Sequence, residues 1–255
     1  MIFIEILHRI NEVEEEILFF ISALIAEIIG TIAGFGSSTI FLPLALLFVD
    51  FKTAIILVAI FHLFGNLGRL TFFRQGLDRR IILQFGVPSI LLSLLGAFMI
   101  GVLPQTFLKL ILGIFLIVTS VSFLAKLGLK FPANSGTFII GGSITGFITA
   151  LVGTGGALRA TLLQGFNIEK IKYIATAATI ALATDASRIP IYILQGFMTE
   201  QYLVYVPALF GIALAGSFIG RRMVKMINQE LFRKIVLIAI ILVSIKLIVD
   251  GLLAQ

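Results

Sequence analysis

Long apolar runs separated by short polar segments dominate the chain. Six of these runs have about the 20 residues that a helix needs to cross a bilayer. They occupy residues 53–73, 81–101, 106–126, 170–194, 202–220 and 231–250. Since only helices and closed barrels satisfy the backbone inside a membrane, runs of this length predict transmembrane helices. The pattern therefore predicts an all-α, polytopic membrane protein.

Two further apolar regions, 17–49 and 137–166, are interrupted by glycine clusters. A single helix over 17–49 would be roughly 50 Å long, which exceeds one crossing. We expect the clusters Gly34-Phe35-Gly36-Ser37-Ser38 and Gly153-Thr154-Gly155-Gly156 to break each region into a hairpin with two short arms. The arms either cross fully or turn back inside the membrane, and their shortness favours re-entry.

Composition agrees with a membrane location and excludes several classes of protein. The chain is 59% hydrophobic and 13% charged, with a mean hydropathy of +1.14, whereas about a quarter of a soluble domain is charged. A soluble enzyme, a nucleic-acid-binding protein and a disordered chain are all excluded. The chain has no cysteine and two histidines, so a thiolate site and a histidine-rich metal centre are excluded as well. We expect no cofactor and no metal.

The distribution of lysine and arginine predicts the orientation in the membrane. If both interrupted regions return to their starting side, twelve basic residues fall on one side: Arg74, Arg79, Arg80, Lys126, Lys130, Lys170, Lys172, Arg221, Arg222, Lys225, Arg233 and Lys234. Arg9, Lys52 and Lys109 fall on the other side. A single crossing by each region would instead divide them six against nine. Because cytoplasmic loops are rich in these residues, we predict a multi-pass protein of a prokaryotic cytoplasmic membrane with both termini outside.

Residues 1–16 form a segment of different character. They carry five glutamates against Arg9, which is unlike the basic start of a secretory signal. Apolar positions recur at helical spacing, so the segment is either an amphipathic helix on the membrane surface or a polar lead-in to the first hydrophobic region.

The chain resembles itself at a separation of about 119 residues, which defines two repeats over 17–128 and 137–252. Asn66 and Arg69 of the first correspond to Asp185 and Arg188 of the second. The loop 101–105 is uncharged, whereas the matching loop 221–234 holds five basic residues. Opposite charge bias in matching loops predicts that the halves insert in opposite orientations, as in many secondary transporters. The alternative is a chance similarity between apolar helices.

The glycine clusters are candidate anion cradles. Irregular backbone inside a membrane is tolerated where it lines a cavity, and the positive end of the following helix would point into that cavity. The predicted contacts from these clusters are Gly34, Gly36, Ser37, Ser38, Gly153, Thr154, Gly155 and Gly156. The alternative is that these glycines only permit a kink or close packing.

Charged side chains inside the bilayer are the other candidates, because they are costly and usually functional. Arg69, Arg159 and Arg188 are the basic residues that lie well inside the apolar segments. We predict that they attract an anion, although Arg69 and Arg188 could instead extend to the headgroups.

Three further side chains are predicted to balance charge or couple it to transport, namely Glu27, Asn66 and Asp185. A protonated glutamate without a transport role is an equal alternative for Glu27. His62 has no counterpart in the other repeat, where Ala181 aligns. We therefore interpret His62 as a packed or hydrogen-bonded side chain.

The ordered, duplicated motifs resemble the TauE/SafE family of sulfite-exporter-like permeases. These motifs are the two glycine clusters with their apolar arms, the run Ala175-Thr176-Ala177 and the Gln-Gly turns at Gln75-Gly76 and Gln195-Gly196. The resemblance implies transport of sulfur-containing anions, commonly export of sulfite or sulfonates. It also implies that the glycine clusters and Thr176 bind substrate. This chain departs from the family in having Ser37-Ser38 where Gly-Gly is usual.

The sequence thus predicts a secondary transporter of a small anion, embedded in a lipid bilayer, without nucleic-acid partners. The sequence is compatible with a homo-oligomer but does not predict one. An anion channel and a membrane sensor or scaffold are the alternatives. A membrane enzyme is disfavoured because the intramembrane acids Glu27 and Asp185 are far apart in sequence and His62 stands alone.

Overall fold

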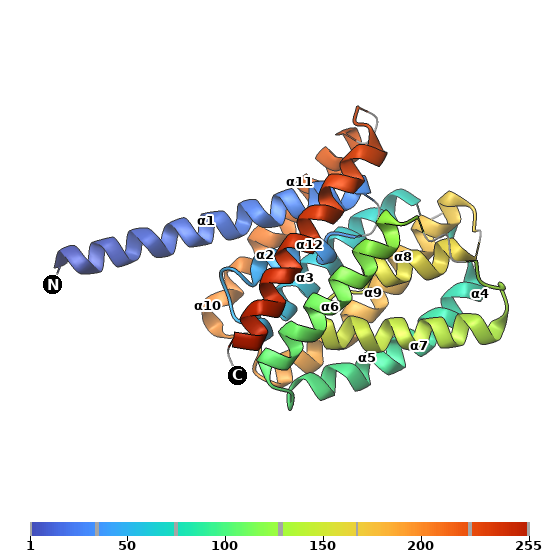
Figure 1. Cartoon of the computed structure of the whole chain (residues 1–255), viewed down its shortest axis with the longest axis horizontal. Helices are drawn as coiled ribbons and strands as arrows, with labels where there is room; N and C mark the ends of the chain where they lie inside the picture. The colour runs from blue at the N-terminus through green and yellow to red at the C-terminus, as the bar shows by residue number, and fades with distance from the viewer. Residues whose placement is uncertain are drawn as a thin grey trace.

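The computed structural model describes residues 2–33, 36–73, 76–126, 130–166, 168–223 and 226–253. Helices are the regular elements of these residues (Figure 1), which confirms the predicted all-α fold class. In chain order they are α1 (Ile2–Ala33), α2 (Ser38–Ala45), α3 (Phe51–Phe73), α4 (Arg79–Ile81), the π-helical η2 (Ile82–Gly86), α5 (Val87–Ile100), α6 (Gln105–Leu124), α7 (Ser135–Val152), α8 (Gly156–Gly165), α9 (Lys170–Leu194), α10 (Glu200–Leu203), α11 (Tyr205–Met223) and α12 (Gln229–Leu253).

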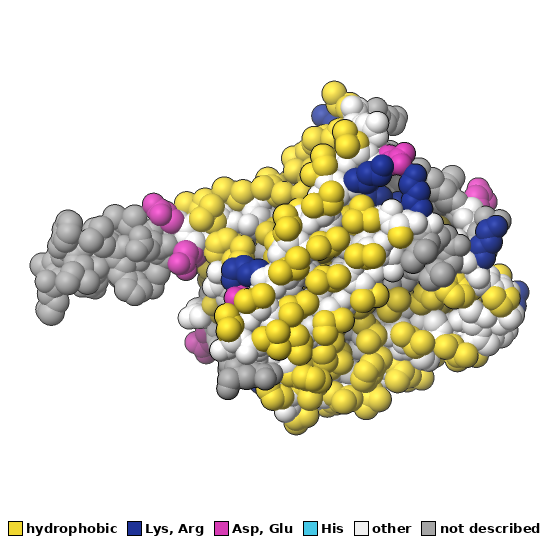
Figure 2. Space-filling view, viewed as in Figure 1, with side chains coloured by type: hydrophobic (Ala, Val, Ile, Leu, Met, Phe, Trp, Pro, Cys, Tyr) yellow, Lys and Arg dark blue, Asp and Glu magenta, His cyan; other side chains and the backbone are white. Residues whose placement is uncertain are grey.

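The helices have the length and surface of membrane-spanning elements. Among the described residues, seven helical stretches are long and apolar enough to cross a bilayer: 13–33, 51–71, 79–100, 105–124, 135–152, 200–223 and 230–253. A nearly continuous hydrophobic surface covers the face formed by α5, α6, α7 and α12 (Figure 2). The protein is therefore a multi-pass membrane protein, as the apolar runs predicted.

Each interrupted region forms a hairpin with one long and one short arm, rather than two short arms. The long arms are α1 and α7, whose apolar stretches of 21 and 18 residues have the length and composition of membrane-crossing helices. The short arms α2 and α8 have 8 and 10 residues, so they are only about 12 and 15 Å long. The helix α1 also runs without a break through residues 2–16 and projects beyond the bundle (Figure 1). Glutamates favour a helix, so the acidic stretch does not end it.

Loop contacts define the two ends of the bundle. At end I, formed by residues 46–50, 101–104 and 195–199, the Phe51 N–H donates to Gln105 Oε1 at 3.1 Å and Gln195 Nε2 donates to Ala97 O at 3.0 Å. End II is formed by residues 76–78, 130–134 and 226–228. There, Lys126, which follows the last residue of α6, forms an exposed ion pair with Glu230 at the start of α12, with Nζ 2.8 Å from Oε1.

The hairpins return to the ends from which they start. Along α1, the Phe19 ring lies 6.2 Å from that of Phe48 near end I, while Ala33 lines a surface pocket with Lys126 near end II. The short arm α2 then leads back to end I. In the other hairpin, α7 leaves end II, and α8 returns there, where Gly165 O accepts from the Phe131 N–H at 3.1 Å.

The charges follow this division. The described members of the predicted cytoplasmic set flank end II, whereas Lys52 and Lys109 lie at the starts of α3 and α6 near end I. Arg74 and Lys225 lie outside the described residues. The helix α1 projects past end I (Figure 1), and α12 finishes near end I, where a Cβ on Gly251 would lie 3.4 Å from Thr106 O of α6. The side of the membrane that each end faces stays a prediction.

The packing of helices is similar in the two halves. Two of the most extensive helix contacts are those of α5 with α7 and of α1 with α11, which are matching pairs if the chain is divided into repeats. The pairs α3 with α9 and α6 with α12 each join one half to the other. This pattern is expected for two halves related by a two-fold axis. The repeat boundaries 17–128 and 137–252 and the inversion stay predictions.

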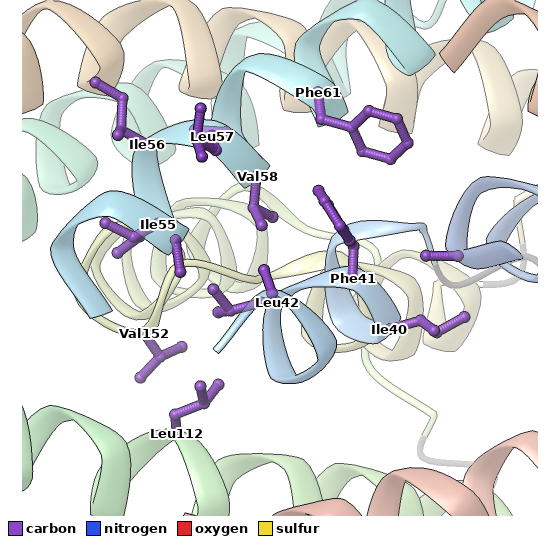
Figure 3. Close-up of a cluster of buried hydrophobic side chains, with 14 of the residues drawn as sticks. Ile40, Phe41, Leu42, Ile55, Ile56, Leu57, Val58, Phe61, Leu112 and Val152 are labelled. Atoms are coloured by element: carbon purple, nitrogen blue, oxygen red, sulfur yellow. The ribbon is translucent and has the colours of Figure 1, made fainter. Parts of the chain in front are cut away.

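The short arm α2 lies inside the molecule and is surrounded by apolar side chains. Its Phe41 points toward Phe61 of α3 and its Leu42 toward Ile55 and Val58, whereas Ile40 points away from α3 (Figure 3). The Phe41 ring is 4.9 Å from the Phe61 ring. A short helix of this kind has few turns of its own, so tertiary packing holds it in place.

Close contact between α5 and α7 depends on glycine, and this dependence can be tested. A Cβ added at Gly146 would lie 1.9 Å from Ser89 O, so Gly146→Ala would force the two helices apart. We expect the substitution to destabilise the protein by about 1–3 kcal/mol or more. The measurement is the melting temperature of the purified protein in detergent. Gly211→Ala on α11 is the control, because nothing lies within 4 Å of its added Cβ; equal melting of the two variants would contradict this packing.

Candidate functional site

The two helix breaks meet in the interior of the protein. Thr154 Oγ1, in the break between α7 and α8, lies 3.1 Å from Ser38 Oγ and 3.1 Å from Thr39 Oγ1 at the start of α2. A Cβ on Gly36 would lie 3.7 Å from the Cα of Gly156. The glycine clusters therefore come together, as expected for cradles of one site, while Gly34 lies outside the described residues.

Backbone conformation at the breaks explains the need for glycine. Gly36 and Gly153 have φ values of +91° and +80°, in the left-handed region that side chains disfavour. Each break is followed at once by a helix, and neither N-cap residue, Ser37 or Gly155, forms a side-chain capping bond. The first N–H groups of α2 and α8 are therefore uncapped by those side chains, and both positive helix ends adjoin the same interior region.

Two buried polar atoms next to these helix ends have no hydrogen-bond partner within the described part of the chain. They are Ser37 Oγ and His62 Nε2, on side chains of residues that are 0% and 3% exposed. A Cβ on Gly36 would lie 3.4 Å from His62 Nε2, so this nitrogen faces the first break. Buried polar atoms are nearly always paired, so two unpaired atoms at one place indicate a position for a ligand.

Arg159 adds a positive charge to this region. It lies one turn into α8 and is 5% exposed. Its guanidinium forms no hydrogen bond or ion pair with the residues that the structure describes. The guanidinium group offers five N–H donors in a planar fork that suits oxyanions. A buried arginine without such partners is costly, which is the arrangement expected where an anion binds.

Arg188 lies in a different environment, because protein acceptors occupy its guanidinium. Nε and Nη2 donate to Asp185 Oδ1 at 3.0 and 2.8 Å. Nη1 donates to Thr149 O at 2.7 Å, and Nη2 to Gly153 O at 3.3 Å. These carbonyls belong to the last turn and C-cap of α7. Arg188 thus fixes the end of α7 at the break.

Asp185 connects α9 to α3. Its Oδ2 lies 2.7 Å from His62 Nδ1, while its Oδ1 accepts from Arg188. The three residues are 0–3% exposed. The chain Arg188–Asp185–His62 therefore extends from the second break to the first. The comparison of the two repeats did not reveal this contact. It aligned His62 with Ala181, whereas the partner of His62 is Asp185, which belongs to the other repeat.

Arg69 and Glu27 form a second buried pair, between α3 and α1. Arg69 Nη2 donates to Glu27 Oε1 at 2.9 Å, and Arg69 Nη1 donates to Asn66 Oδ1 at 3.2 Å. Ser217 Oγ on α11 also donates to Glu27 Oε1, at 2.6 Å. These contacts join three helices beside the site. The coupling role of Glu27 and Asn66 stays a prediction.

Thr176 lies near end II. Its Oγ1 accepts a hydrogen bond at 3.0 Å from the N–H of Asp78, the residue that caps α4. No described hydrogen bond connects Thr176 to the hydroxyl cluster of Ser38, Thr39 and Thr154. Its part in substrate binding, which the family resemblance implies, stays a prediction.

Comparison with known families places the chain. The family model described as Sulfite exporter TauE/SafE matches residues 19–247 of the 255 residues. The chain belongs to the TauE/SafE family. Searches among curated proteins and among solved structures gave no significant match. The predicted family is confirmed, and membership makes the chain a membrane transporter.

The TauE/SafE match covers both helix breaks, Arg159 and the buried pairs. The structure brings together most of the predicted glycine-cluster residues, namely Gly36, Ser37, Ser38, Gly153, Thr154, Gly155 and Gly156, and Arg159 follows them one turn later in α8. Sequence analysis missed His62 as part of this group. Its position on the face of α3 that also carries Asn66, one turn later, was the available signal.

Proposed function

We propose that this protein is a secondary transporter of a small sulfur-containing oxyanion or organosulfur anion, such as sulfite or a sulfonate, and that it exports this anion across the cytoplasmic membrane of a prokaryote. The observation that carries the proposal is the buried Arg159 beside two helix N-termini that meet in the interior. Helix N-termini and guanidinium groups are the usual protein ligands of oxyanions.

The chemistry of the breaks suits a compact anion with several oxygens. Arg159 supplies charge and a bidentate fork. The hydroxyls of Ser37, Ser38 and Thr154 and the N–H groups that begin α2 and α8 supply further donors. The buried pairs Asp185–Arg188 and Glu27–Arg69 cancel their own charges, so Arg159 provides the net positive charge. Sulfite and the sulfonate group each present three oxygens to such a ring of donors.

We propose a carrier rather than a channel because the site is closed in this conformation. Ser37, Ser38 and Thr154 are 0–1% exposed, whereas a channel needs a continuous path. One hairpin comes from end I and the other from end II, and this supports inverted repeats. Movement of one hairpin with its partner helices against the other would open the site to each side in turn.

In this mechanism Arg188 and Asp185 position the second break, in place of the substrate contact predicted for Arg188. The contacts from Arg188 to Thr149 O and Gly153 O support this role, since they leave its guanidinium no open donor in the direction of the break. Arg69, which is held by Glu27, is proposed to support the wall formed by α1 and α3.

Flux measurements on the purified protein test the proposal. In proteoliposomes loaded with radiolabelled sulfite, we expect efflux that saturates with sulfite concentration and is inhibited by methanesulfonate. Protein-free liposomes provide the background. Non-saturating current across a planar bilayer would indicate a channel, and sulfite binding without flux would indicate a sensor or scaffold; either result overturns the proposal.

A further inference from the structure

His62 combines a fixed nitrogen with a free one at the site. Nδ1 lies 2.7 Å from Asp185 Oδ2, and Nε2 has no partner among the described residues and faces Gly36. Arg188 donates two hydrogen bonds to Asp185 Oδ1. Because an ionised carboxylate beside Arg188 only accepts, Nδ1 carries the proton in the neutral form of the His62 ring, and Nε2 then faces the break without a proton.

Burial and the surrounding charges together decide when a second proton on His62 is favourable. The groups that act on the ring are Asp185 on α9, Arg159 on α8 and Arg69 on its own helix α3. Arg188 on α9 pairs with Asp185, and Glu27 on α1 pairs with Arg69. The charge of Arg159 therefore opposes an imidazolium at His62. A bound anion would neutralise Arg159 and attract a proton to Nε2.

We propose that His62 is a substrate-contacting residue whose Nε2 takes up one proton when the anion binds and donates that hydrogen bond to an anion oxygen. This proposal rests on the proposed function. The proton comes from water on the side where the site is open, stays on Nε2 in the closed state and returns to water on the other side. One proton is thus carried with each anion, and a doubly charged anion leaves the closed site electrically balanced by Arg159 and His62.

Nitrogen NMR of the whole protein tests this proposal directly. The chain contains only His8 and His62, so labelling histidine with nitrogen-15 gives two sets of ring signals, and His8→Gln identifies the set of His62. Saturating sulfite is expected to shift the Nε2 signal of His62 from the range of a bare ring nitrogen to that of a protonated one. Calorimetry on the same sample shows whether sulfite is bound.

Proton uptake provides the second measurement. Calorimetry in two buffers of different ionisation enthalpy gives the number of protons taken up for each sulfite bound. This number includes any change in the protonation of sulfite itself, so variants are compared with one another. We expect wild type and His8→Gln to take up one proton more than His62→Gln, whose amide can still donate near the Nε2 position but does not titrate.

Bound sulfite with an unchanged Nε2 signal, or equal proton uptake by wild type and His62→Gln, would overturn the role of His62 and leave the proposed function intact. Absence of sulfite binding and flux in wild type would overturn the proposed function and this inference together.

Discussion

Replacing Arg159 with glutamine is expected to weaken sulfite binding by about ten- to a hundredfold and to slow flux in parallel. The loss of a charge-assisted hydrogen bond corresponds to about 1.5–3 kcal/mol, and about 1.4 kcal/mol is a factor of ten in affinity. Stability should stay unchanged or rise, because the substitution removes a buried charge that has no partner among the described residues. Isothermal calorimetry with sulfite and thermal melting in detergent are the measurements.

Two further variants make the result specific. Arg79→Gln removes the same charge from an exposed position at end II, and its affinity should match wild type. Arg159→Lys keeps the charge but loses the planar fork, so its affinity should lie between wild type and Arg159→Gln. Wild-type affinity in Arg159→Gln would remove Arg159 from the site and with it the main support for the location of the anion.

The elements were largely predictable from sequence because the membrane imposes their length. The run predicted at 170–194 coincides with α9 (Lys170–Leu194), although its charges distinguish it from the seven apolar spans. The glycine clusters predicted the breaks for a similar reason, since Gly36 and Gly153 adopt positive φ values. The length of α1 was not predicted. The glutamates before residue 17 change the polarity of the chain, which suggested a separate segment, but glutamate favours a helix and does not end one.

The site was only partly predictable, since its members come from both halves. Arg159 was identified from one local feature, a charge one turn after a glycine break. The separate roles of Arg159 and Arg188 depend on acceptors far away in sequence, such as Thr149 O and Gly153 O. Hydropathy and repeat matching contain no information about these contacts. For the same reason the prediction that His62 is a packed or hydrogen-bonded side chain did not name its partner, Asp185, which lies 123 residues away.

Replacing Arg188 with methionine is expected to cause the largest loss of stability, in contrast to the substitution of Arg159. The change leaves Asp185 buried without its ion-pair partner and removes donors from Thr149 O and Gly153 O. Breaking a buried pair from one side costs about 3–5 kcal/mol. We expect a clearly lower melting temperature in detergent, with loss of flux as a consequence of the loosened break.

A second substitution distinguishes the loss of the pair from the loss of the side chain. In the double variant Arg188→Met with Asp185→Asn, no charge of the pair stays buried, so the melting temperature should recover part of the difference. The control Arg222→Met removes an exposed arginine of α11 and should melt like wild type. If Arg188→Met retained wild-type stability but lost sulfite binding, Arg188 would be the substrate contact and the roles of the two arginines would be reversed. Arg159→Gln and Arg188→Met together therefore decide which guanidinium binds the anion and which stabilises the break between α7 and α8.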